Sequence, residues 1–165
     1  MLGISQPPGG LALCAALLER HFSGRWVSVD VVACFEAGGF VYASALAARM
    51  DVPLALISEA GKLPPPTMSV VKSLSYISSS ASNHDSKARI EMGRDTAPKG
   101  VSVLVVDDVL ATGRTSCGCW VRLASAPNVS VIVVAEFPVH HGRELPRRHG
   151  FSGVNVQSLL VFGGA

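Results

Sequence analysis

Two adjacent carboxylates stand before a short loop of hydroxyl residues and glycine in the segment LVVDDVLATGRT, residues 104–115. The aliphatic run that leads to Asp107 and Asp108 is typical of a buried strand. Ligands of an open parallel sheet bind at the carboxyl ends of its strands, which is where we expect both carboxylates to lie. Two neighbouring carboxylates need donors, and the vicinal hydroxyls of a sugar or a hydrated divalent cation would serve.

The residues that follow the carboxylates favour the binding of an anion. Residues 111–115 read ATGRT and lead into a helix that we expect over residues 115–125. The N–H groups and the dipole of a helix N-terminus attract phosphate. Thr112 and Thr115 add hydroxyl donors, and Gly113 permits an unusual backbone angle. A simpler interpretation, a strand end followed by a helix cap, does not explain why all these features occur in this order.

Composition favours one α/β domain over residues 1–165. Hydrophobic residues make up 48% of the chain and charged residues 16%, which suits a sheet buried on both faces. The net charge is +2 and the basic residues are scattered, so we expect no nucleic-acid partner. The four cysteines form no CxxC pair, and no apolar run approaches the ~18 residues of a membrane span. We therefore expect a cytoplasmic protein without a membrane partner.

Apolar, β-branched segments alternate with helix-like segments along the chain. This order predicts a three-layer fold with a mostly parallel twisted sheet and right-handed crossovers. We expect strands at residues 27–35, 52–57, 101–106, 129–137 and 154–162, and helices at residues 11–22, 40–50 and 115–125.

Two segments depart from this alternation. Residues 1–10 are rich in turn-forming residues and predict a loose N-terminus. Residues 61–100 begin with the stiff sequence GKLPPPT and continue into a polar, serine-rich stretch. We interpret this region as a long flexible lid loop with room for two short strands.

Three segments carry a resemblance to a known family. VLVVDDVLATGRT, residues 103–115, resembles the phosphoribosyl-pyrophosphate (PRPP) signature of the type I phosphoribosyltransferases. Residues 31–67 resemble the adenine phosphoribosyltransferases of that family, in which a strand, an EARGF-like turn, a helix and an RKxGKLP-like segment follow one another. Residues 87–108 continue the likeness, which covers roughly residues 27–137.

The resemblance implies a Mg²⁺-assisted transfer of ribose 5-phosphate from PRPP to a purine base, with release of pyrophosphate, as in purine salvage. It also implies a homodimer, and it places a nucleoside monophosphate in the same site. Asp107 and Asp108 would contact the ribose and help hold Mg²⁺ through water and PRPP, and Lys62 would act with them as a catalytic phosphate contact. The implied PRPP loop is Asp107, Asp108, Val109, Leu110, Ala111, Thr112, Gly113, Arg114 and Thr115, and the implied pyrophosphate turn is Glu36, Ala37, Gly38, Gly39 and Lys62.

The lid would exclude water from the reaction, which a transfer from PRPP requires. The family has a glutamate-tyrosine-glycine element there, whereas this chain has no glutamate between Glu59 and Glu91. Our lid candidates are Tyr76, Asp85 and Lys87.

The chain departs from the enzymes at the pyrophosphate end. Gly38 stands where the family has an arginine, and Ser58 and Glu59 stand where it has an arginine-lysine pair. Losing charge-assisted contacts to an anion weakens the stabilisation of departing pyrophosphate. Three hypotheses stay open: an adenine-phosphoribosyltransferase-like enzyme, a PRPP- or nucleotide-binding regulatory protein or subunit with weakened catalysis, and an enzyme redirected to another base.

Overall fold

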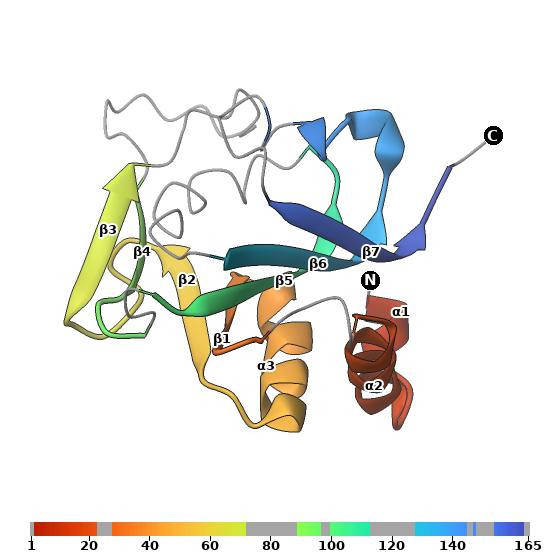
Figure 1. The fold of residues 1–165 in the computed structure, drawn as a ribbon, viewed down its shortest axis with the longest axis horizontal. Coiled ribbons are helices and arrows are strands. Elements are labelled where there is room, and N and C mark those ends of the chain that lie inside the picture. The colour runs from red at the N-terminus through yellow and green to blue at the C-terminus, as the bar shows by residue number, and fades with distance from the viewer. Residues whose placement is uncertain are drawn as a thin grey trace.

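A seven-stranded mixed sheet forms the centre of the protein (Figure 1). The computed structural model describes residues 2–22, 28–71, 89–96, 100–112, 128–144, 147 and 154–163. The order of the strands across the sheet is β3-β4-β2-β1-β5-β6-β7. The strands are β1 Val31–Phe35, β2 Leu54–Glu59, β3 Thr67–Val71, β4 Arg89–Gly93, β5 Ser102–Leu110, β6 Asn128–Glu136 and β7 Asn155–Val161.

Five neighbouring strands of this sheet pair in parallel, namely β2, β1, β5, β6 and β7. β4 pairs antiparallel with both β2 and β3 at one edge. The mostly parallel sheet expected from the sequence is therefore confirmed, and the two short strands expected in the lid region form its antiparallel edge.

Side chains of the central strands alternate between two hydrophobic clusters, as the twofold repeat of a strand requires. Val32, Leu104 and Ile132 face α2 (Gly10–Phe22) and α3 (Gly38–Met50). In Figure 1 these two helices lie on one side of the sheet together with α1 (Leu2–Ser5). Each fully buried aliphatic side chain stabilises the fold by about 1.5–3 kcal/mol.

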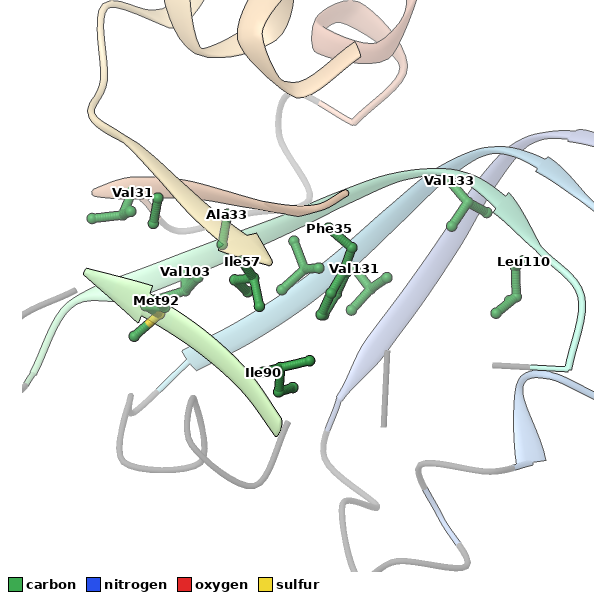
Figure 2. Packing of buried hydrophobic residues seen from close by; sticks show 12 residues of the cluster. Val31, Ala33, Phe35, Ile57, Ile90, Met92, Val103, Leu110, Val131 and Val133 are labelled. Atoms are coloured by element: carbon green, nitrogen blue, oxygen red, sulfur yellow. The ribbon is translucent and has the colours of Figure 1, made fainter. Parts of the chain in front are cut away.

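The second cluster lies on the opposite face of the sheet (Figure 2). It joins β1, β5 and β6 to β2 and β4, so the antiparallel edge and the parallel centre share one core. Its members include Val31, Ala33, Phe35, Ile57, Ile90, Met92, Val103, Leu110, Val131 and Val133.

Several boundaries differ from the sequence-based expectations; β1 begins at Val31 instead of residue 27, and β2 is Leu54–Glu59 instead of residues 52–57. Residues 2–5 form a helix where a loose N-terminus was expected. α3 begins at Gly38, two residues before the expected start, so the glycine turn is also the first turn of the helix. β5 continues to Leu110 instead of ending at Val106, because β6 pairs with it along its whole length. The helix expected over 115–125 lies outside the described residues.

Among the described residues, a 3₁₀ turn, Pro138–His140, follows β6. No helix in this part of the chain is long and apolar enough to cross a membrane.

Candidate functional site

The two carboxylates lie where β5 extends beyond β1. Cys34 of β1 pairs with Val106 of β5, so the next residues of β5 lie beside the turn that leads from β1 into α3. β6 still pairs with Asp107 there, which keeps this part of the strand extended. A site is thus formed between the end of β1, the start of α3 and the last third of β5.

Asp107 is the buried member of the pair, with a relative exposure of 9%. Its Oδ1 accepts a hydrogen bond from the backbone N–H of Asp108 at 2.9 Å. Burial raises the pKa of Asp107 to about 7, and the nearby charge of Asp108 also raises it, while the N–H donor opposes the shift. Asp107 therefore changes its charge near neutral pH.

Asp108 occupies the space beside Gly38. A Cβ atom at Gly38 would lie 2.3 Å from Oδ2 and 2.4 Å from Cγ of Asp108. A Cβ at Gly39 would lie 3.3 Å from Asp107 Oδ1. The structure therefore brings the predicted pyrophosphate turn and the two carboxylates into contact, and it leaves no room for a side chain at Gly38 while Asp108 keeps its position.

Gly38→Ala is expected to lower the free energy of unfolding by about 1 kcal/mol, since the new methyl group must displace the Asp108 carboxylate. Urea denaturation measures the change. Gly3→Ala in α1 is the matched control, because a Cβ there meets nothing within 4 Å. Equal stability of the two variants would show that Asp108 leaves this position freely.

Glu36 is held by the end of β2. Its carboxylate accepts hydrogen bonds from Ser58 Oγ at 2.5 Å and from the backbone N–H of Glu59 at 3.0 Å. These bonds and the Lys62 ammonium lower the pKa of Glu36 to about 2, with the Ser58 hydroxyl the largest cause. Glu36 is thus a carboxylate throughout the physiological pH range. Its peptide bond to Ala37 is cis.

Lys62 is paired with two carboxylates. Its Nζ lies 2.9 Å from Glu36 Oε1 and 3.1 Å from Glu59 Oε2. Both pairings raise the pKa of Lys62, with the hydrogen bond to Glu36 the larger cause. The sequence indicated that Lys62 would contact phosphate but did not reveal that Glu36 and Glu59 bind it.

Glu91 of β4 fixes the backbone around Lys62. Its Oε1 accepts hydrogen bonds from the N–H groups of Gly61 at 2.8 Å and Leu63 at 2.9 Å. Thr67 Oγ1 donates to the other oxygen at 3.2 Å. The N–H of Leu63 is the largest cause that lowers the pKa of Glu91. The sequence analysis missed this role, because only the antiparallel pairing of β2 with β4 brings Glu91 to the turn.

A second network missed from the sequence ties the end of β6 to β7. Glu136 is buried, and Arg143 donates to it from Nε at 2.5 Å and from Nη2 at 2.6 Å. Arg143 also donates to the carbonyl of Val156 at 2.6 Å, and Ser158 joins Glu136 and Arg143. An acid followed seven residues later by an arginine is the one signal of this network in the sequence.

The predicted PRPP loop is described only in part. Val109 and Leu110 are strand residues, and Leu110 packs in the hydrophobic core. The carbonyl oxygen of Ala111 lies close to Gly142, where a Cβ would be 2.2 Å away. Thr112 is exposed. Gly113, Arg114 and Thr115 of the loop, and Tyr76, Asp85 and Lys87 of the lid, lie outside the described residues.

Comparisons with known proteins identify the family of the chain. The model of the phosphoribosyl transferase domain family matches residues 4–163, nearly the whole chain. The chain belongs to the phosphoribosyl transferase family. The resemblance inferred from the sequence is thereby confirmed.

Two adenine phosphoribosyltransferases are similar to this chain, one in sequence and one in structure. The adenine phosphoribosyltransferase of Novosphingobium aromaticivorans is 31% identical over 157 residues, which cover 94% of this chain and 82% of that protein. The crystal structure of adenine phosphoribosyltransferase from Thermoanaerobacter pseudethanolicus superposes with a TM-score of 0.79 at 27% identity, covering 96% of this chain and 84% of the other.

A second similar structure is a complex with ligands. It is the adenine phosphoribosyl transferase of Trypanosoma brucei in complex with AMP, pyrophosphate and ribose-5-phosphate. Its TM-score is 0.81 at 18% identity, with 96% of this chain and 67% of that chain covered, so it supports the shared fold alone.

Proposed function

We propose that the protein transfers ribose 5-phosphate from PRPP to a purine base, with adenine as the expected acceptor, and releases pyrophosphate. One observation carries this proposal: Asp107 and Asp108 lie in contact with the first turn of α3. The chain that brings them together belongs to the phosphoribosyl transferase family. The similarity to the adenine phosphoribosyltransferase of Novosphingobium aromaticivorans supports a substrate of this class.

Different residues of the described chain would contact different parts of the substrate. Asp108 would accept hydrogen bonds from the vicinal hydroxyls of the ribose, with Asp107 beneath it. The backbone N–H groups at the start of α3 favour an anion, and Ala37 at the N-cap makes no side-chain hydrogen bond to them. The phosphate of the ribose would lie at residues 111–115.

The two carboxylates also fit Mg²⁺, which prefers oxygen ligands. In the part of the chain that the structure describes, no group of three or more His, Cys, Asp or Glu could hold a metal ion. Asp107 and Asp108 would therefore bind Mg²⁺ together with water and oxygens of PRPP. The ion would supply positive charge against the departing pyrophosphate.

A second function is favoured by the surroundings of Lys62. This lysine is already paired with Glu36 and Glu59, and Gly38 offers no cation. A protein that binds PRPP or a nucleoside monophosphate but turns it over slowly, as a regulatory protein or subunit, is consistent with these contacts. By resemblance to the family we propose a cytoplasmic homodimer in either case.

Turnover separates the two functions. The protein is incubated with PRPP, Mg²⁺ and a panel of purine and pyrimidine bases, and nucleotide and pyrophosphate are followed together with calorimetric binding of PRPP. Formation of AMP from adenine supports the enzyme, whereas binding without turnover supports the second function. If PRPP and nucleotides do not bind, and Asp107→Asn and Asp108→Asn change nothing, both proposals are rejected.

A further inference from the structure

The pyrophosphate turn together with Glu59 at the end of β2 contains more negative than positive charge. Glu36 and Glu59 both lie within 3.1 Å of the Lys62 ammonium, so two carboxylates against one ammonium leave a net charge of −1. Asp108 adds a further carboxylate where the Cβ of a residue at position 38 would lie. An incoming pyrophosphate therefore meets a lysine whose charge is already balanced.

The two carboxylates bind Lys62 in different ways. Glu36 is held by Ser58 and by the backbone N–H of Glu59, so it is a fixed part of the turn. The side chain of Glu59 is 62% exposed and that of Lys62 52%, so this second pair lies at the surface. Because Glu91 fixes the backbone at Gly61 and Leu63, Lys62 stays within reach of Glu59.

We propose that Glu59 determines which ligands the site prefers, by neutralising Lys62 and repelling pyrophosphate. This inference rests on the second proposed function, binding of a nucleoside monophosphate with slow turnover, and deepens it. Pyrophosphate at Lys62 would compete with Glu59 for the ammonium, whereas a monoester such as ribose 5-phosphate would contact the carboxylates of β5. The site therefore favours ribose 5-phosphate or a nucleoside monophosphate over ligands that carry pyrophosphate.

Glu59→Gln tests the proposal directly, because the amide keeps the size of the side chain and removes its charge. We expect pyrophosphate with Mg²⁺ to bind about tenfold more tightly to the variant, since one like charge beside a multiply charged anion is lost. The dissociation constant of ribose 5-phosphate should change by less than about twofold. Isothermal titration calorimetry measures both.

Glu19→Gln is the matched control. Glu19 is an exposed carboxylate paired with Arg49, so the variant has the same net charge as Glu59→Gln. Arg49 lies eleven residues along α3 from Gly38, or roughly 16 Å at the helical rise. We expect Glu19→Gln to bind pyrophosphate as the native protein does.

The outcomes distinguish the inference from the function on which it rests. The inference is wrong and the function stands if ribose 5-phosphate binds but Glu59→Gln has the same affinity for pyrophosphate as the native protein. The same conclusion follows if ribose 5-phosphate binds and pyrophosphate binds detectably to neither protein. An equal gain in Glu19→Gln would also overturn it, because net charge alone would then explain the effect. If neither ligand binds any variant, the proposed function itself fails.

Discussion

Arg143→Met is expected to lower the free energy of unfolding by about 3 kcal/mol, because it leaves the buried Glu136 carboxylate without its ionic partner. The side chain of Glu136 is only 6% exposed, so water cannot replace the guanidinium. Methionine keeps much of the apolar stem of arginine, which limits the loss of packing. Urea denaturation at pH 7.5 measures the change.

Arg49→Met is the control for this prediction. Arg49 pairs with Glu19 at the surface, where both side chains are more than a third exposed, so its loss should cost at most about 0.5 kcal/mol. The double variant Arg143→Met with Glu136→Leu should recover part of the stability by removing the unpaired charge. If Arg143→Met costs no more than Arg49→Met, the network does not stabilise the fold.

Asp107→Asn is expected to raise the free energy of unfolding above pH 7, by on the order of 3 kcal/mol. Burial raises the pKa of Asp107 to about 7, from the ordinary value of 3.8. The folded state therefore holds a proton that the unfolded state has released between these pH values, and native stability falls as the pH rises through this window. Asparagine carries no charge there and still accepts the hydrogen bond from the N–H of Asp108.

The pH dependence is the decisive part of that prediction. The difference between Asp107→Asn and the native protein should be small near pH 4, grow up to about pH 7 and then level off. Thermal unfolding across this range measures it, and Asp51→Asn at an exposed position is the control. A constant difference at every pH would show that Asp107 does not titrate in this window.

Much of the fold follows from local patterns in the sequence. Strand β1 and residues 131–135 of β6 are continuous apolar runs, which predict burial on both faces, and alternation with helices predicts parallel pairing. The boundaries of β5 and α3 were misplaced because partners distant in the sequence decide them. Pairing with β6 extends β5 through Asp107 and Asp108, and the first turn of α3 includes Gly38 and Gly39.

The candidate site, like the fold, could be predicted from the sequence only in part. Asp107 and Asp108 were identified from the sequence because they belong to one contiguous motif, residues 104–115. The role of Glu91 depends on antiparallel pairing between β2 and β4, which are separated by residues 60–88, and the ion pair of Glu36 with Lys62 joins the end of β1 to the turn after β2. No local pattern reports that kind of contact, so the balance of charge around Lys62 needed the structure.

Calorimetric titration with ribose 5-phosphate tests the central claim, recognition of a ribose phosphate by the carboxylates of β5. We predict saturable binding to the native protein and at least a tenfold weaker affinity for Asp108→Asn, because the amide cannot accept hydrogen bonds from the sugar hydroxyls at both its terminal atoms. Glu19→Gln should bind as the native protein does. Equal affinity of Asp108→Asn and the native protein, or no binding to either, would contradict the account.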